Sequence, residues 1–401
     1  MMRTNALLVS LLALACGEAP GVAPPTAQTP GPVEQTPNDG EPGDAPPVVV
    51  VDRVAKLSAS QAELYLGKVA PPVVGRVLGS EERAAIAADG GKAIGPILQA
   101  WLAEPGFVRS ARRFVELGLQ VSGQINGVDF DLPGNLVEYV VKNERPWSEV
   151  LTSESCYDAQ LQPVACDSGA PFTAGVLTTR AFLISRSSRF NLTRSSALMK
   201  NFACQVYPQE PELQPRIDKA RLIPMFQANT AEEQTDDRAK SGFGNGLGCY
   251  GCHGQFSLHA QLYVKFDSSG LYRAEATGLQ DPEGELGRSL DGLMASHLAD
   301  PLEAAVERSN MFGQEVENLK DAAKVVATQE TFAPCAAQRF LDFTLGVQNG
   351  AIAYEPAIFD EVVNKARAAQ PEPTLQSIVA NLLTHPTVVL SIIESLGGAT
   401  E

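Results

Sequence analysis

Apolar residues along this chain recur mainly at the three- and four-residue spacing of α-helices. Between residues 107 and 119 they occupy positions 107, 108, 111, 114, 115 and 119, so they line one face of a helix. A capping box that begins at Ser60 predicts the start of another helix, because Glu63 lies three residues later. The same signals predict helices from Ser80, over 94–102, over 136–141, from Asp300, over 332–345 and over 375–383.

One stretch of the chain is expected to form strands. Residues 260–266 and 271–277 are rich in apolar and aromatic side chains, and they flank Asp267-Ser268-Ser269-Gly270. Asp, Ser and Gly are the residues that favour a tight turn. We therefore predict a small β-hairpin within an otherwise helical protein.

The first fifteen residues carry the pattern of an export signal. Arg3 supplies a positive charge, and an almost unbroken apolar run covers residues 6–15, which is too short to span a membrane. Ala15 precedes Cys16, an arrangement that resembles the lipobox of bacterial lipoproteins. This resemblance implies a signal peptide over 1–15, a lipid on Cys16 and, since Gly17 follows, sorting to the outer membrane, facing the periplasm or the surface. The alternative is an ordinary signal peptide with an incidental cysteine.

Residues 16–50 have the composition of a disordered tether. The segment is rich in proline, contains acidic residues and has neither lysine nor arginine, so it offers almost nothing that could form a core. The whole chain has a net charge of −16, which argues against nucleic acid as a partner and against direct adhesion to an anionic surface. The membrane is expected as a partner only through the lipid on Cys16.

The strongest chemical signal is Cys249-Tyr250-Gly251-Cys252-His253. Two thiols separated by two residues and followed directly by an imidazole form the attachment signature of c-type haem. The thiols add to the two haem vinyl groups, and His253 then ligates the iron on the proximal side. A structural zinc site would need two more ligands, and no second Cys-x-x-Cys or His-x₃₋₅-His pair exists. A thioredoxin-like pair would follow a strand, whereas residues 241–246 are typical of a loop.

Four further cysteines form an even set. In an oxidising compartment Cys156, Cys166, Cys204 and Cys335 are expected to form two disulfides, for which three connectivities exist. Cys156 and Cys166 flank a short segment suited to a local loop, which leaves Cys204 to pair with Cys335. The alternative is four free, buried thiols.

Several segments around the haem motif resemble the planctomycete-type cytochrome c proteins, which are uncharacterised domains also common in myxobacterial lipoproteins. The segments are Cys249–Gly254, Lys265-Phe266-Asp267 with Gly270 and Tyr272-Arg273, Cys335-Ala336-Ala337-Gln338-Arg339 with Leu345-Gly346, and, upstream, Asn143-Glu144-Arg145-Pro146 with Glu149-Val150-Leu151-Thr152. The resemblance covers roughly 55–400. It implies one covalent haem c and a role in cell-envelope redox chemistry. We expect a helical N-terminal domain (51–200), a cytochrome c-like haem domain (201–350) and C-terminal helices (351–401) that pack on the body.

The distal iron ligand decides between two classes of function. A methionine would give an electron carrier, while an open site would permit peroxide chemistry or catalysis on an organic substrate. Met294 and Met311 are the leading candidates by their distance from His253, followed by His297, His259 and Met225. We expect electron transfer with an envelope redox partner. Two alternatives stay open. One is a haem-dependent oxidoreductase, or the haem subunit of one, and the other is a binding module in which haem only stabilises the structure.

A basic run in this acidic chain has two interpretations. It could pair with haem propionates, or it could be a solvated face with acidic neighbours, and the second is favoured. The run consists of Arg180, Arg186, Arg189, Arg194 and Lys200.

Overall fold

The computed structural model confirms a mainly α fold. Strands in the described part of the chain form three small antiparallel two-stranded sheets. The predicted signal peptide and tether lie outside the described residues, which are 53–125, 127–187, 191–205, 221, 254, 258–275, 296, 298, 300–347 and 354–398.

The helices predicted near the start of the chain are present. They are α1 (Ala59–Val74), α2 (Ser80–Asp89), the 3₁₀ helix η1 (Gly90–Ala93), α3 (Ile94–Leu102) and α4 (Pro105–Leu119). The predicted cap of α1 is wrong by two residues. Ser58, and not Ser60, has the extended backbone of a cap, and its hydroxyl accepts the Gln61 amide while the Gln61 side chain accepts the Ser58 amide.

Helices and short hairpins alternate in the middle of the chain. The helices are α5 (Leu132–Lys142), α6 (Glu149–Thr152), η2 (Gly175–Thr178), α7 (Arg180–Ser185) and α8 (Leu192–Phe202). Strand β1 (Gln124–Ile125) pairs with β2 (Val128–Asp129), and β3 (Cys156–Tyr157) pairs with β4 (Pro163–Val164). A disulfide between Cys156 and Cys166 closes the second hairpin, with its Cα atoms 5.0 Å apart.

The predicted hairpin around residue 267 is largely wrong. The first of its two expected strands contains the 3₁₀ helix η5 (Gln261–Tyr263), and a single isolated bridge pairs Phe266 with Tyr272. Residues 260–264 are all buried, and the Gln261 side chain donates to the carbonyls of Glu303, Ala304 and Val306, which favours a helical turn here. The turn itself is present: the Asp267 carboxylate accepts the backbone amides of Ser269 and Leu271. Residues 276 and 277 lie outside the described residues.

From residue 300 onward, the described residues form one hairpin and several helices. Strands β5 (Ser309–Met311) and β6 (Gln314–Val316) pair with each other. The helices are α10 (Pro301–Ala304), α11 (Leu319–Ala327), α12 (Phe332–Leu345), α13 (Pro356–Ala369), α14 (Leu375–Leu383) and α15 (Pro386–Ser395).

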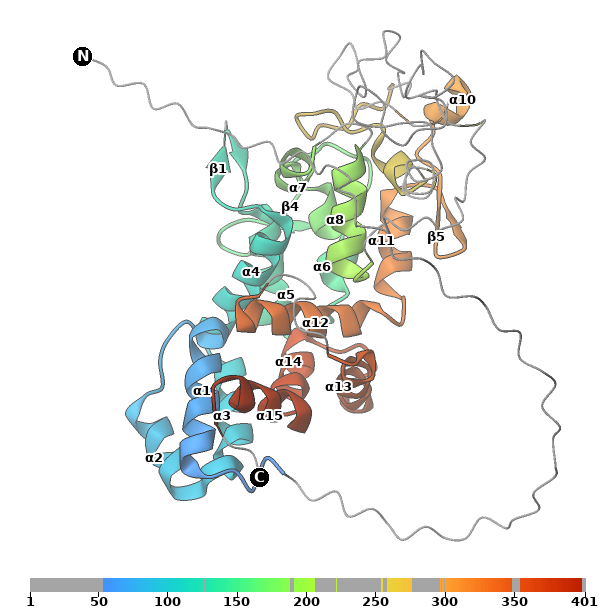
Figure 1. Ribbon diagram of the computed structural model, residues 1–401. Helices are drawn as coiled ribbons and strands as arrows, with labels where there is room; N and C mark the ends of the chain where they lie inside the picture. The colour runs from blue at the N-terminus through green and yellow to red at the C-terminus, as the bar shows by residue number, and fades with distance from the viewer. Residues whose placement is uncertain are drawn as a thin grey trace, which may run out of the picture. The chain divides into compact units, whose positions relative to one another are not determined.

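Helix α12 links the N-terminal and C-terminal helices in one compact unit of the chain after Val51. It contacts α1 and α8 as well as α13 and α14, and in Figure 1 it lies between α8 above and α13 and α14 below. Phe340 of α12 packs against Phe107 and Phe114 of α4, with ring centroids 6.1 and 5.4 Å apart. The C-terminal helices also reach the start of the chain, since α14 contacts α3 and the buried Tyr65 hydroxyl donates to the Leu383 carbonyl at 2.6 Å.

Within the described ranges, no single helix is both long and apolar enough to cross a membrane. Helices α14 and α15 together reach the required length and apolarity, with a 60° bend between them. Their apolar side chains, including Ile378, Leu382 and Ile392, are buried in the core.

Candidate functional site

The residues predicted to attach haem lie outside the described residues. These are Cys249, Cys252 and His253, and the same holds for the lipid-anchor candidate Cys16 and for Met294, His297 and Met225. Beyond His253 the structure describes Gly254 and then residues 258–275. The structure therefore describes the segments before and after this motif, which include residues 191–205 and 258–275.

Gln261 fixes the segment that follows the haem motif. Its buried side-chain amide donates to the carbonyl oxygens of Glu303, Ala304 and Val306, at 2.9, 3.0 and 2.6 Å. Its amide oxygen accepts the Ser296 hydroxyl at 2.6 Å. The two N–H groups of this amide are shared among three carbonyls around the end of α10, and they tie η5 to that helix.

Arg194 fixes the other side of the same segment. Its guanidinium is fully buried and donates to the carbonyls of Leu183, Phe266 and Asp267, at 3.0, 2.8 and 2.6 Å, and to Asn191 Oδ1 at 2.9 Å. Burial lowers its pKa to about 10. The side chain joins α7 and α8 to the turn at Asp267, so it is a structural clamp.

The solvated-face interpretation of the basic run is therefore wrong for Arg194. It fails in part for Arg186, which is half-buried and donates to the carbonyls of Leu119 and Gly118 at 3.1 and 2.7 Å. Arg180 donates to the Ser269 carbonyl at 3.0 Å, and Lys200 is exposed. Arg189 lies outside the described residues. Basic residues that lie close together in the sequence thus occupy very different environments.

The second disulfide joins Cys204, just beyond α8, to Cys335 in α12, with the Cα atoms 5.2 Å apart. Both bridges have the pairing favoured from the sequence. The segment between Cys204 and Cys335 contains the whole haem motif. Its two ends are therefore fixed to each other and to α8 and α12.

Two candidates for the distal ligand lie in the described part of the chain. Met311, at the end of β5, is fully buried and belongs to the apolar core. His259 is also buried.

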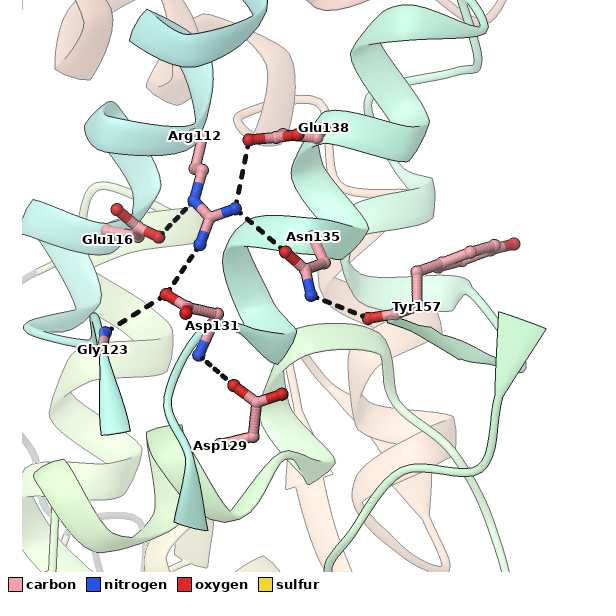
Figure 2. Close-up of polar contacts among 8 residues, drawn as sticks. All are labelled: Arg112, Glu116, Gly123, Asp129, Asp131, Asn135, Glu138 and Tyr157. Carbon is pink, nitrogen blue, oxygen red and sulfur yellow. Dashed lines mark hydrogen bonds and ion pairs between the residues drawn. The ribbon is translucent and has the colours of Figure 1, made fainter. Parts of the chain in front are cut away.

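A polar cluster around Arg112 was not expected from the sequence. Figure 2 shows its guanidinium among Glu116, Asp131, Asn135 and Glu138, at 2.6, 2.7, 2.9 and 3.1 Å. Asn135 continues the network to the Tyr157 carbonyl. Burial raises the pKa of Glu116, against the opposing effect of Arg112. The cation sits among the carboxylates, so the cluster is an internal network that joins α4 to α5.

A cleft of about 580 Å³ lies between α4, α8 and α12. Arg113, Arg186, Lys200 and Arg339 line it, together with Phe114 and Phe343. The sequence pointed to Arg186 and Lys200 only as members of the basic run. The spacing of Cys335 and Arg339, one helical turn apart, is the signal that would have placed Arg339 near the bridge.

No family model, no curated protein and no solved structure matched the chain in our comparisons. Within the described ranges, no group of three or more His, Cys, Asp or Glu side chains could hold a metal ion.

Proposed function

We propose that the protein is an exported, lipid-anchored cytochrome that carries one haem c and exchanges electrons with a redox partner in the cell envelope. The observation that carries the proposal is the sequence Cys249-Tyr250-Gly251-Cys252-His253. Its donor set, two thiols and an imidazole at this spacing, fits covalent haem. The two disulfides support an oxidising compartment, which is where haem c is attached.

Each residue of the motif has a separate role in this proposal. Cys249 and Cys252 would hold the haem through thioether bonds, and His253 would bind its iron. The haem would supply one-electron exchange between ferric and ferrous iron. The chain's own contribution is to keep the motif in place, because Gln261 and Arg194 fix the segment after it and the Cys204–Cys335 bridge closes the loop around it.

Removal of both motif cysteines tests the proposal. Cys249→Ala with Cys252→Ala should abolish the haem that stays with the polypeptide in denaturing electrophoresis, because no thioether can form. The matched control is Cys156→Ala with Cys166→Ala, which also removes two cysteines but should keep the covalent haem. Covalent haem in the first double variant would refute the assignment.

The visible spectrum of the purified protein tests the electron-transfer role. Low-spin bands with a methionine–iron charge-transfer feature are expected, and their loss in Met294→Ala or Met311→Ala would identify the distal ligand. High-spin bands would instead favour a haem-dependent oxidoreductase with an open distal position.

A separate variant tests the lipid anchor. Cys16→Ser should move the protein from membranes to the soluble envelope fraction.

A further inference from the structure

The cleft between α4, α8 and α12 is positively charged in a strongly acidic protein. Four cationic residues line it, and Asp342 is the carboxylate among its lining residues, which gives a net positive charge of three. The chain as a whole has a net charge of −16. Local charge of the opposite sign to the whole molecule attracts ligands that the rest of the surface repels.

Arg339 is buried and Arg186 is half-buried, and in the described residues no carboxylate lies within ion-pair distance of either guanidinium, although Asp342 acts on Arg339 from further away. Arg339 is only 8% exposed; its Nη2 donates to Asn201 Oδ1 at 2.6 Å, and its Nη1 has no hydrogen-bond partner. Arg186 donates from Nε and Nη2 to the backbone carbonyls of Leu119 and Gly118. Leaving a buried charged donor unpaired is costly, so the site suits an anion from outside.

The surroundings of the two guanidiniums change their pKa values. Burial lowers the pKa of both side chains, and for Arg339 the Asp342 carboxylate raises it again while the Arg186 charge lowers it to a smaller extent. A bound carboxylate would offset the cost of keeping these charges away from water, because its two oxygens can accept hydrogen bonds from a guanidinium.

The remainder of the lining is apolar. Phe114 and Phe343 lie with ring centroids 5.8 Å apart, and Leu117, 58% exposed, borders the same cleft. A volume of about 580 Å³ lies in the usual range for a small organic ligand. Inorganic phosphate would leave the aromatic surface uncovered, so the lining favours an anion with an apolar body.

We propose that this cleft binds a small organic anion, with its carboxylate on Arg186 and Arg339 and its apolar or aromatic body against Phe114 and Phe343. Such binding is a second activity, separate from haem attachment. The Cys204–Cys335 bridge positions the site, because Cys335 lies one turn before Arg339 and Cys204 lies three residues after Asn201. Gly118 allows α4 to lie close to α8, because a Cβ atom at this position would be only 2.9 Å from Asn201 Oδ1.

Calorimetric titration of the full-length protein, purified with its haem, tests this inference. The probes are benzoate, 2-naphthoate and decanoate, with 2-naphthamide as the uncharged match and inorganic phosphate as the anion without an apolar body. At least one carboxylate should bind with 1:1 stoichiometry. 2-Naphthamide and phosphate should bind at least tenfold more weakly than that carboxylate.

Variants then locate the binding site. Arg339→Gln and Arg186→Gln should each weaken carboxylate binding at least tenfold, while Arg308→Gln, an exposed arginine paired with Glu317, should change it less than twofold. Phe343→Ala should weaken binding of 2-naphthoate while the positions of Arg186 and Arg339 stay unchanged.

Three results would overturn the proposal. The first is the absence of binding by all three carboxylates, as expected if the haem's own propionates fill the cleft. The second is equal binding of 2-naphthoate and 2-naphthamide. The third is unchanged affinity in Arg339→Gln, which would mean that Arg339 is satisfied within the protein, for example by one water in the adjoining cavity of about 20 Å³. Haem retention in the cysteine variants is independent of all three.

Discussion

The Arg339 guanidinium donates a 2.6 Å hydrogen bond to the Asn201 side chain and so joins α12 to the last turn of α8. The same two helices are joined covalently at Cys204 and Cys335, within one turn of this contact. The hydrogen bond and the disulfide therefore hold one helix pair from two adjacent points. This pair forms a wall of the cationic cleft and also closes the segment that carries the haem motif.

Loss of the Cys204–Cys335 bridge should destabilise the protein strongly. The two residues are separated by 131 positions, and in the chain-entropy model closing such a loop contributes about 5 kcal/mol, against about 3 kcal/mol for the short Cys156–Cys166 loop. Cys204→Ala with Cys335→Ala is therefore expected to lower the free energy of unfolding more than Cys156→Ala with Cys166→Ala, as measured by urea denaturation.

The haem should stay attached in both disulfide variants, because the thioether bonds do not depend on either bridge. Organic-anion binding should weaken only in the variant without Cys204–Cys335. Peptide mapping of the unreduced protein checks the pairing itself. A peptide that links Cys204 to Cys156 or Cys166 would contradict the arrangement of α8 and α12.

Replacement of the buried Arg194 should be among the most damaging single changes. Arg194→Leu leaves the carbonyls of Leu183 and Phe266 without a donor in the interior and removes one of the two donors to the Asp267 carbonyl, which keeps the Gly270 amide. Each unsatisfied buried group costs about 1–3 kcal/mol, so for two such groups the expected loss of unfolding free energy is roughly 2–6 kcal/mol.

Arg308→Leu is the matched control, because Arg308 and its partner Glu317 are both more than half exposed. Its effect should stay within about 0.5 kcal/mol in the same chemical denaturation experiment. Similar losses in the two variants would show that the Arg194 clamp does not form. Haem-dependent signals should change only in Arg194→Leu, through the segment at Phe266.

The helices could be predicted from the sequence because their signals are local. The apolar stripe over 107–119 matches the buried face of α4, which includes Phe107, Ala111 and Val115. The strand prediction at 260–266 failed because an apolar run has no periodicity of its own. In that run the carbonyls around α10, far along the chain, bind Gln261 and favour the helical turn.

The site was only partly predictable for the same reason. The pairing of Cys156 with Cys166 follows from a short loop, and the remaining pair follows by elimination. The difference between Arg194 and Lys200, by contrast, depends on which elements pack over α8. The cationic cleft combines side chains of α4, α8 and α12, which no local pattern brings together.

Glu82 should make the stability of the N-terminal helices depend on pH. Its carboxylate accepts hydrogen bonds from Arg76 at 2.7 and 2.9 Å, from the Gly79 amide and from the Trp101 indole. The Arg76 bond is the main cause that lowers the pKa of Glu82 from 4.5 to about 2. A carboxyl group with a lowered folded-state pKa stabilises the fold above its ordinary value, and the contribution is lost as the pH falls from about 4.5 to about 2.

Glu82→Gln should therefore be less stable than the wild-type protein at pH 7, and the difference should shrink steadily below pH 4.5. Urea denaturation at pH 7, 5, 4 and 3, followed by tryptophan fluorescence, measures this difference, since Trp101 contacts Glu82 directly. Glu317→Gln serves as the control at an exposed ion pair, and it should differ from wild type by less than about 0.5 kcal/mol throughout. A Glu82→Gln difference that stays constant from pH 7 to pH 3 would show that the Arg76–Glu82 pair does not stabilise the folded protein.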